Sequence, residues 1–258
     1  MNRIMDAFRS GKAFIPFITA GDPDMETTGR LLLTLADAGA DAIEIGIPFS
    51  DPIAEGPVIQ EADERALKAG FTVDKLFDLI TCVRPRIKAP LLFMSYYNPV
   101  FVYGNEKFTG KCAAGGIDGL IVPDLPYEER DELLNPCASN RLMLISLIAP
   151  TSDARIEKIV KGSEGFIYCV SSLGVTGERH ELDDNARKMV KQAKRVKDIP
   201  CAVGFGISTP EQARKTAEFA DGVITGSAIV RIVGEKGADC ITPVYQFAMN
   251  IKHAIKTL

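Results

Sequence analysis

The chain has 258 residues, a formal net charge of −4 at pH 7 and 46% hydrophobic residues. This composition is typical of globular proteins and argues against collagen-like and intrinsically disordered classes. The weak negative charge also argues against a nucleic-acid partner, since proteins that bind polyanions usually carry a basic patch. The one basic run, over residues 187–197, fits the solvent face of a helix.

No segment contains the roughly 18 uninterrupted apolar residues that a membrane-spanning helix needs. Residues 1–14 are charged and amphipathic, and they lack the apolar core of a secretory signal. We therefore expect a cytoplasmic protein without a membrane partner. Six cysteines are scattered along the chain without a C-x-x-C pair, so we expect reduced thiols and neither disulfides nor a zinc site.

Short apolar runs alternate along the chain with longer segments of helical periodicity. This alternation is typical of a parallel sheet that is covered by helices. Because the runs are apolar at consecutive positions, both faces of each strand should be buried. Eight strands are expected, at residues 14–20, 42–47, 91–96, 119–122, 142–148, 165–170, 201–204 and 222–224.

A helix is expected after each strand, with two helices, 57–69 and 73–87, between the second and third strands. A short helix near residues 3–8 should precede the first strand. Eight strand–helix units without a linker favour an α/β fold of the closed (β/α)8 TIM-barrel type, formed as a single domain over residues 1–258. An open doubly wound sheet is the alternative, but the sequence lacks the nucleotide fingerprint of that fold.

In a barrel, the polar residues at the carboxyl ends of the strands decide the chemistry. The strands and their exits carry no lysine, which argues against a Schiff-base aldolase. The chain has only two histidines, so we expect no metal site. Carboxylates remain, and Glu44 lies inside an apolar strand, where an ionised side chain is costly. General acid–base catalysis is the favoured interpretation, and a buried acid with a structural role is the alternative.

Glycine-rich segments follow the predicted sixth, seventh and eighth strands. Glycine at a strand exit lets backbone N–H groups approach an anion at the start of a helix. Phosphate sites of TIM barrels form at the seventh and eighth units, so Gly206, Gly226 and Ser227 are candidates to bind a phosphate. The segment over 171–177 is long enough to serve as a lid. Each glycine cluster taken alone could equally be a turn.

Together these motifs are similar to those of the tryptophan synthase α subunit family. The similarity covers essentially the whole chain, and its P-F-S-D-P motif is highly specific. The matching segments are E-I-G-I-P-F-S-D-P-I-A-E-G-P at 44–57, G-V-T-G at 174–177, V-G-F-G-I-S at 203–208 and G-S at 226–227.

The resemblance implies a lyase that reversibly cleaves indole-3-glycerol phosphate into indole and glyceraldehyde 3-phosphate. It also implies an α2β2 heterotetramer, in which a β subunit that depends on pyridoxal phosphate (PLP) uses the indole for tryptophan biosynthesis. No cofactor is expected in this chain itself. Two alternatives stay open: a free-standing lyase, and a non-catalytic regulatory subunit that binds a sugar phosphate.

The resemblance further implies roles for the acids. Glu44 would give a proton to indole C3 and take one from the glycerol hydroxyl, and apolar walls would raise its pKa so that it starts protonated. A second carboxylate would stabilise positive charge at the ring nitrogen, and by family position this is Glu55. Aspartate is commoner there, so the longer side chain requires an adjusted loop. Asp51 is expected to organise the loop or meet the partner, and Asp124 to be structural.

Aromatic residues are expected by family position at the walls or rim of an indole pocket, although each could equally be barrel core. Thr19, Thr176 and Gly177 are the expected polar contacts to the glycerol phosphate or to the lid. The aromatic residues are Phe17, Tyr96, Tyr168 and Phe205.

Overall fold

Eight parallel strands close into a barrel in the computed structural model, and β8 returns to pair with β1. The structure describes residues 3–170, 179–204 and 206–256, with only the backbone of 179–183. The predicted (β/α)8 TIM barrel is confirmed. The strands are β1 (Ala13–Thr19), β2 (Ile43–Gly46), β3 (Leu91–Met94), β4 (Gly119–Ile121), β5 (Met143–Ile148), β6 (Ile167–Val170), β7 (Cys201–Gly204) and β8 (Gly222–Thr225).

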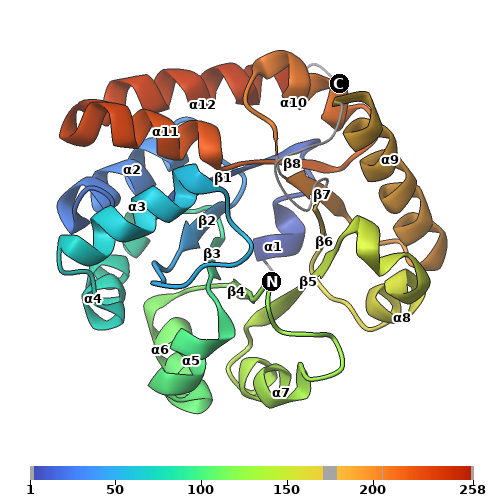
Figure 1. The fold of residues 1–258 in the computed structure, drawn as a ribbon, viewed down its shortest axis with the longest axis horizontal. Helices are drawn as coiled ribbons and strands as arrows, with labels where there is room; N and C mark the ends of the chain where they lie inside the picture. Colours follow the sequence, from blue (N-terminus) through green and yellow to red (C-terminus); the bar gives the residue numbers. More distant parts are fainter. Residues whose placement is uncertain (1–2, 171–178, 205, 257–258) are drawn as a thin grey trace.

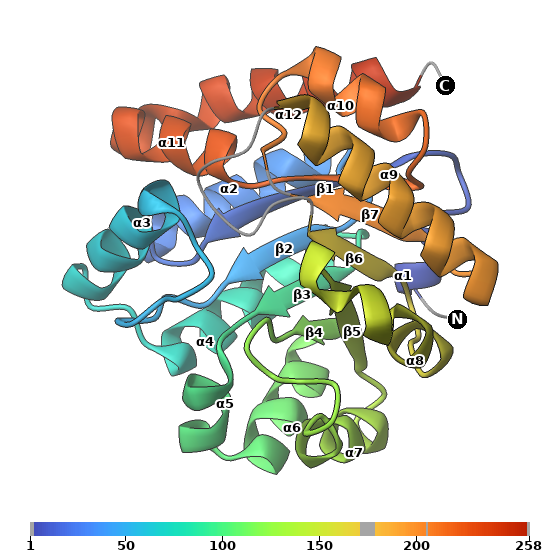
Figure 2. The same ribbon diagram turned by 45° about the vertical axis from the view of Figure 1, so that its right-hand side comes forward.

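Helices form the layer outside the strands (Figures 1 and 2). On one side of the barrel, α12 packs on α2 and α11 packs on α3, so the ring of helices continues past the junction of β8 with β1. The helices are α1 (Arg3–Asp6), α2 (Met25–Asp37), α3 (Pro57–Lys68), α4 (Val73–Val83), α5 (Tyr97–Tyr103), α6 (Asn105–Gly115), α7 (Asp131–Ser139), α8 (Ile156–Lys161), α9 (Arg179–Val196), α10 (Pro210–Ala217), α11 (Ser227–Lys236) and α12 (Ile241–Lys256), with short 3₁₀ helices at Arg84–Arg86, Pro150–Arg155 and Gly237–Cys240.

The strands are buried on both faces because alternate side chains serve two cores. Along β1, Phe14 and Ile18 pack outward against the helices, whereas Ala13 and Ile15 join the cluster inside the barrel. Helix α1 adds Ile4 to the inner cluster, where this side chain is 1% exposed. In Figure 1 α1 lies in the middle of the ring of strands.

The register of the strands decides which way Glu44 points. Glu44 pairs with Phe17 on β1 and with Leu92 on β3. Side chains alternate along a strand, so Glu44 shares a face with Ala42, and both Ala42 and Leu92 belong to the inner cluster. The carboxyl group of Glu44 therefore points into the barrel.

Several predicted boundaries differ from the structure, and three of these differences have identifiable reasons. The expected helix over 73–87 ends at Val83 and continues as a 3₁₀ turn, because Pro85 has no N–H to continue the helical ladder. Strand β6 begins at Ile167 and not at Gly165, which has a φ of 72° that an extended strand does not adopt. Strand β3 ends at Met94, two residues before the predicted end, since the chain turns there toward α5.

The six cysteines are free thiols, and all except Cys82 are buried. Within the described ranges, no three His, Cys, Asp or Glu residues gather closely enough to hold a metal ion. No helix in the described part of the chain has both the length and the apolar character that crossing a membrane requires.

Candidate active site

A small cavity lies at the carboxyl ends of β1, β2 and β3, the end where TIM-barrel enzymes bind their substrates. Its volume is about 10 Å³, which is close to the space of one water molecule. Both acidic and apolar side chains line it. They come from the strands, from the loop between β2 and α3 and from α3 itself, and they include Phe17, Gly46, Glu55, Asp63, Met94 and Tyr96.

Glu44 is fully buried in the barrel interior. Neither of its carboxyl oxygens has a hydrogen-bond partner among the described residues. Burial raises the pKa of Glu44 to about 8, because an ionised carboxylate loses its hydration in an apolar interior. Glu44 is therefore mostly protonated at neutral pH and can donate a proton to a bound molecule. The prediction of a buried acid in this strand is confirmed.

Thr19 supplies a second buried polar group without a hydrogen-bond partner among the described residues. It is the last residue of β1, faces the same side as Phe17 and pairs in register with Gly46. Its side chain is 2% exposed, and its hydroxyl has no partner in the described part of the chain. Because leaving a buried hydroxyl unpaired costs free energy, Thr19 is well suited to hydrogen-bond a bound molecule.

Tyr96 anchors the loop that carries the second acid. Its hydroxyl donates a hydrogen bond to Oε2 of Glu55. The hydroxyl oxygen of Tyr96 in turn accepts hydrogen bonds from the backbone N–H groups of Ile53 at 2.8 Å and Ala54 at 2.7 Å. The ring of Tyr96 packs against Phe49 with the centroids 5.2 Å apart. Tyr96, predicted as an apolar wall, thus contributes a hydroxyl that fixes the loop as well as a ring.

Glu55 is half-buried and faces the cavity. Its pKa is raised, first by the loss of hydration and to a smaller extent by the negative charge of Asp124, while the hydrogen bond from Tyr96 opposes the rise. Its backbone carbonyl accepts a hydrogen bond from Nε2 of Gln60 at 2.9 Å. The first turn of α3 therefore helps to fix the end of this loop.

Tyr168 links the two predicted acids. Burial raises the pKa of its hydroxyl far above the usual value, and the negative charges of Glu44 and Glu55 raise it further. Glu44 also lies in register with Phe17, and Phe17 lines the cavity together with Glu55. A Cβ atom at Gly204 would lie 2.6 Å from that hydroxyl oxygen, so glycine at the end of β7 makes room for the ring. The structure brings Glu44 and Glu55 to the same end of the barrel.

Phe17 fills the space between two other glycines. A Cβ atom at Gly46 would lie 2.5 Å from Cζ of Phe17, which is closer than real Cβ contacts come. A Cβ atom at Gly226 would lie 3.4 Å from the same ring, an ordinary contact. Phe17 is 8% exposed and lines the cavity as an apolar side chain, and its contact with an indole ring stays a prediction.

Of the predicted phosphate contacts, Gly206 lies in the loop before α10. Its φ is 80°, which favours glycine, and a Cβ atom there would meet nothing within 4 Å. The start of α10 is already capped, because the side-chain oxygen of Gln212 accepts hydrogen bonds from the N–H groups of Ser208 at 2.8 Å and Thr209 at 3.2 Å. These two N–H groups are therefore less available to an anion.

The start of α11 is more open. Gly226 is its N-cap and makes no side-chain cap, and the exposed Ser227 is the first helical residue. The first N–H groups of a helix have no acceptor within the helix and attract anions. The remaining predicted contacts, Phe205, Thr176 and Gly177, lie outside the described residues.

The other two acids of the sequence analysis serve local structure. Asp51 accepts a hydrogen bond from the Ser50 hydroxyl at 2.5 Å in an exposed part of the loop. Asp124 accepts one from the backbone N–H of Tyr97 at 2.9 Å, at the start of α5. Neither residue is among those that line the cavity.

Sequence reasoning missed Asp63, an acid of α3 that lines the cavity and is 6% exposed. The signal was present, because the buried face of α3 consists of Ile59, Ala62, Asp63 and Ala66 at helical spacing. An acid on an otherwise apolar helix face has to be neutral, paired or functional.

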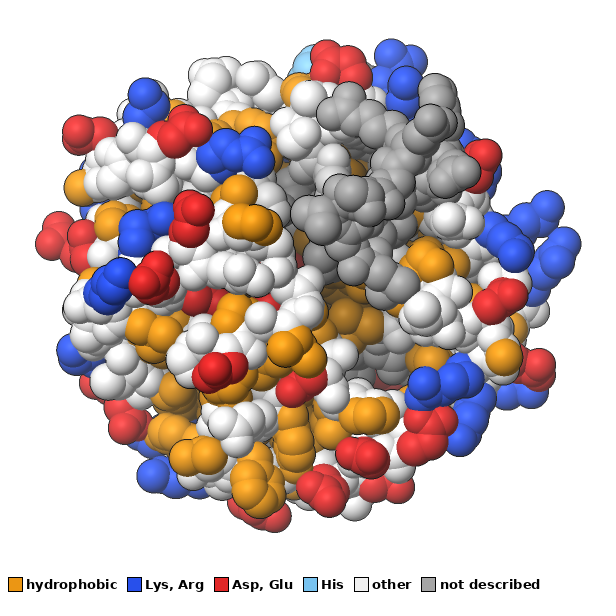
Figure 3. All heavy atoms as spheres, in the orientation of Figure 1, with side chains coloured by type: hydrophobic (Ala, Val, Ile, Leu, Met, Phe, Trp, Pro, Cys, Tyr) orange, Lys and Arg blue, Asp and Glu red, His pale blue; other side chains and the backbone are white. Residues whose placement is uncertain are grey.

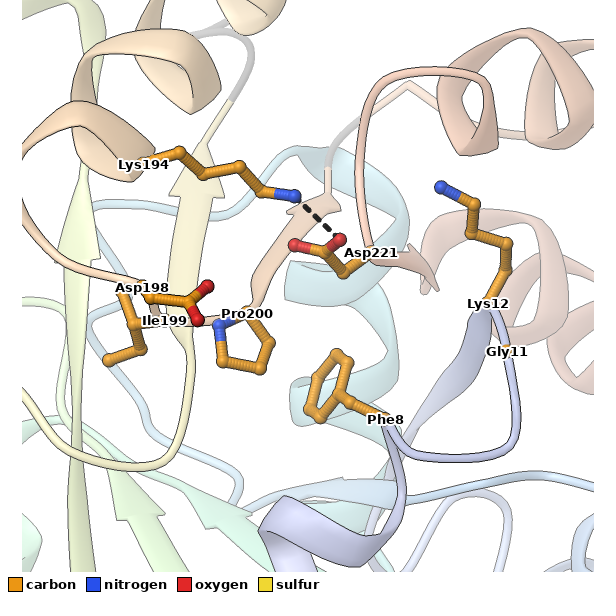
Figure 4. Close-up of a pocket in the computed structure, with 8 residues that line it drawn as sticks. All are labelled: Phe8, Gly11, Lys12, Lys194, Asp198, Ile199, Pro200 and Asp221. Carbon is orange, nitrogen blue, oxygen red and sulfur yellow. Dashed lines mark hydrogen bonds and ion pairs between the residues drawn. The ribbon is translucent and has the colours of Figure 1, made fainter.

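A larger cavity of about 330 Å³ lies at the opposite end of the barrel (Figure 4). It is bounded by residues that precede β1, β7 and β8, such as Lys12, Pro200 and Asp221. Its lysines are engaged: Lys194 pairs with Asp221 at 2.7 Å, and Lys12 donates to the carbonyl of Ala220 at 2.8 Å. In TIM barrels this end serves stability, so the smaller cavity is the better candidate for the active site.

Comparison with known proteins agrees with this geometry. Residues 5–257 match the family model described as "Tryptophan synthase alpha chain". The chain is 46% identical over 255 residues to the tryptophan synthase alpha chain of Lacticaseibacillus casei, covering 99% of this chain and 96% of the relative. It is 50% identical over 237 residues to that of Halalkalibacterium halodurans, covering 91% of this chain and 89% of the relative.

Solved structures give the same result. Tryptophan synthase subunit alpha from Legionella pneumophila superposes with a TM-score of 0.91 at 36% identity, with full coverage of both chains. A chain of the tryptophan synthase α2β2 complex from Pyrococcus furiosus superposes with a TM-score of 0.87 at 39% identity, covering 94% of this chain and 99% of that chain. With a family match along nearly its whole length and a buried acid at the carboxyl end of a TIM barrel, the chain belongs to the tryptophan synthase alpha chain family.

Proposed function

We propose that this chain cleaves indole-3-glycerol phosphate into indole and glyceraldehyde 3-phosphate. The observation that carries this function is the carboxyl group of Glu44, which is fully buried and without a hydrogen-bond partner among the described residues, in a chain of this family. A protein keeps such a costly group in its interior when a bound molecule uses it. The reaction needs a neutral acid beside an apolar ring, and Glu44 supplies one.

Glu44 begins the reaction protonated, because burial raises its pKa to about 8. It gives this proton to C3 of the indole ring, which becomes cationic. The resulting carboxylate takes the proton of the glycerol hydroxyl while the bond between C3 and the side chain breaks and its electron pair returns to the ring. Glu44 is then protonated again, so the residue is ready for the next turnover.

Glu55 stabilises the cationic ring at its nitrogen. Tyr96 occupies Oε2 of this carboxylate and leaves Oε1 to accept a hydrogen bond from the ring N–H. The hydrogen bonds from the N–H groups of Ile53 and Ala54 to the same hydroxyl hold the loop near Tyr96. This anchoring would let the loop place the longer glutamate side chain at a position where aspartate is commoner.

The remaining groups bind the substrate and do not react. Phe17 and Tyr168 are walls for the indole ring, and the unpaired hydroxyl of Thr19 binds the glycerol chain. Gly226 and Ser227 bind the phosphate through backbone N–H groups at the start of α11. The apolar ring and the anionic end of the substrate thus meet different strand ends of the same barrel.

We also propose that the chain works with a tryptophan synthase β chain in an α2β2 complex, the assembly named for the Pyrococcus furiosus relative. Pyridoxal phosphate belongs to the chemistry of that partner, and we assign no cofactor to this chain. The cytoplasmic location expected from the sequence stays a prediction.

An apolar surface patch marks where this partner would dock. We define the patch by Ile53, Phe101 and Val102, which are 82%, 62% and 77% exposed. Ile53 lies in the loop after β2, and the other two lie on α5, the helix that follows β3. Figure 3 shows apolar side chains gathered over the region of α5. A docked partner would therefore cover the end of the barrel at which indole is released.

The direct test is an indole-release assay on Glu44→Gln, run with and without the β chain. Glutamine keeps the size of the side chain but cannot cycle a proton, so we expect indole release to fall by at least about 100-fold. Binding of glycerol 3-phosphate, measured by calorimetry, should stay within about twofold, since phosphate contacts lie elsewhere.

Glu61→Gln makes the same chemical change at an exposed position of α3 and should leave indole release unchanged. If Glu44→Gln releases indole at the wild-type rate, the assignment of Glu44 is wrong. If the wild type releases no indole from the substrate with or without a β chain, the proposed function is wrong. A rate that does not respond to the β chain would indicate a free-standing lyase.

A further inference from the structure

Helices α3 and α11 lie next to the two ends of the proposed site. The loop before α3 carries Glu55, and the start of α11 is the proposed contact for the phosphate. The two helices pack against each other, and both also contact β1 (Figure 1). The position of α11 on α3 therefore helps to set the distance between the acid and the phosphate.

An apolar cluster forms one part of this helix contact. It joins α3, α11 and β1, and its buried members are Phe17, Ile59, Ala62 and Val230. Phe17 also lines the cavity beside Glu55, so the cluster reaches the site itself. Apolar contacts have no preferred direction, and they do not by themselves fix one helix at a single position on another.

Arg65 supplies a directional contact at the same junction. Its Nε and Nη2 atoms, on α3, donate hydrogen bonds to the two carboxyl oxygens of Asp22 at 2.8 and 2.9 Å. Two parallel hydrogen bonds between planar groups fix the orientation of the guanidinium. The side chain of Asp22 is 2% exposed and lies in the loop after β1, where its backbone N–H donates to the carbonyl of Thr19 at 3.4 Å. Arg65 thus ties α3 to the end of β1.

The guanidinium of Arg65 also lies against α11. A Cβ atom at Gly234 would lie 2.9 Å from Nη2 and 3.3 Å from Cζ of Arg65. Gly234 is inside α11, where glycine is less favourable for a helix than alanine. Because this position has no side chain, α11 can approach the ion pair closely. The loop after β1, α3 and α11 therefore meet around one guanidinium group.

We propose that Asp22 and Arg65 form a positioning pair for phosphate binding: the pair fixes the guanidinium against Gly234, which holds α11 at one position on α3 and so aligns the first N–H groups of α11 with the phosphate. Neither acid nor base of the pair lines the cavity, so the pair acts through α11. The inference rests on the proposed function for the identity of the ligand. The junction of the three elements does not depend on that function.

Gly234→Ala tests the close approach without changing a charge. Its Cβ atom would collide with Nη2, and Arg65 cannot move away without breaking its hydrogen bonds to Asp22. We expect calorimetry to show about 5- to 20-fold weaker binding of glycerol 3-phosphate. The KM of indole release should rise, with kcat within about twofold of the wild type. Gly110→Ala in α6, where a Cβ atom meets nothing within 4 Å, should change none of these values.

The same substitution in an Asp22→Asn background separates positioning from a simple loss of packing. Asparagine cannot hold the guanidinium with two charged hydrogen bonds, and the side chain of Arg65 is 36% exposed, so it can turn toward solvent. Gly234→Ala should then weaken binding of glycerol 3-phosphate by less than about twofold. Equal losses in the two backgrounds would mean that the ion pair does not hold α11, and the inference would be wrong.

Arg65→Lys keeps the charge but cannot form two parallel hydrogen bonds to one carboxylate. We expect it to weaken binding of glycerol 3-phosphate by about 3- to 10-fold. Arg231→Lys makes the same change at an exposed position of α11 and should leave binding unchanged. A merely structural role of the pair would lower the unfolding temperature of Arg65→Lys without changing its affinity for glycerol 3-phosphate.

Affinity for glycerol 3-phosphate is measured without turnover, so this inference and the proposed reaction can fail separately. If Gly234→Ala and Arg65→Lys bind glycerol 3-phosphate as tightly as the wild type, the inference is wrong whatever the rate of indole release. If both variants bind it weakly and the wild type releases no indole, the positioning pair is supported and the lyase is refuted. A wild type that does not bind glycerol 3-phosphate would overturn both the phosphate site and this inference.

Discussion

Burial of Glu44 favours the proposed reaction but lowers the stability of the folded protein at neutral pH. Its pKa is raised from 4.5 to about 8, so the folded protein holds a proton there that the unfolded chain has already lost at neutral pH. The folded state therefore loses stability as the pH rises from 4.5 toward 8, by up to about 5 kcal/mol once both states are ionised. The same burial keeps the acid protonated for the reaction.

We predict that Glu44→Gln becomes more stable than the wild type as the pH rises. The two proteins should differ little near pH 4.5, and the difference should grow to several kcal/mol near pH 8, because glutamine cannot ionise. Urea unfolding at a series of pH values measures this difference. A gap between the two proteins that stays constant with pH would mean that Glu44 is not held neutral in the folded state.

The sequence predicts a functional side chain where that side chain interrupts a local pattern of hydrophobicity. Glu44 stands out because an ionisable side chain interrupts an apolar strand. The hydroxyl role of Tyr96 could not be predicted, since its partners are backbone groups and an acid more than 40 positions away in the sequence. Asp63 was missed because acids are common on helices and only the buried face of α3 makes this one unusual.

At the scale of elements, glycines at strand ends decide where the aromatic walls can stand. Gly46 ends β2 and Gly204 ends β7, and each lies against a ring on the neighbouring strand, Phe17 or Tyr168. A larger residue at either position would collide with the ring and force it to move. The sequence analysis gave Gly204 no role, and the structure shows that it makes room for Tyr168.

We predict that Gly46→Ala destabilises the protein by about 1 to 3 kcal/mol and weakens substrate binding, because its Cβ atom would lie 2.5 Å from the ring of Phe17. Thermal unfolding and calorimetry with an indole ligand measure both effects. The matched control is Gly110→Ala in α6, where a Cβ atom meets nothing within 4 Å and alanine should stabilise the helix by a few tenths to about 1 kcal/mol. Equal stability of the two variants would contradict this role of Gly46.

The elements themselves were largely predictable, since each strand is an apolar run between helical segments. Their ends were less so. Strand β3 stops early because the chain turns into α5. Helix α4 ends at Val83 because Pro85 has no N–H to donate to the helical hydrogen bonds. Such limits come from hydrogen bonding and packing between segments, which local patterns of hydrophobicity do not record.

At the scale of the whole molecule, the proposed chemistry and the exposed apolar patch of Ile53, Phe101 and Val102 belong to the same end of the barrel. Large exposed apolar side chains at the end of the barrel that carries the site fit a surface of protein contact. The opposite end holds the larger cavity, in which Lys194 pairs with Asp221 and Lys12 donates a hydrogen bond to a backbone carbonyl.

We predict that replacing Phe101 and Val102 together by serine weakens binding of the β chain by about tenfold or more, because apolar anchors dominate such contacts. Thermal stability and the indole release of the isolated chain should not change, since both side chains are exposed. Serine replacements of Tyr245 and Met249 on α12, each 39% exposed, are the control. If both pairs weaken the complex equally, the patch is not the docking surface.

Helix α1 limits the path by which a ligand can enter and leave the barrel. Ile4 packs among the inner side chains of the strands, so α1 covers the interior of the barrel at the end where the strands begin. A ligand that enters at the carboxyl ends of the strands must therefore leave at the same end. A partner bound at that end would meet the indole as it leaves the site. Transfer of indole between the two enzymes would then require no tunnel through this chain.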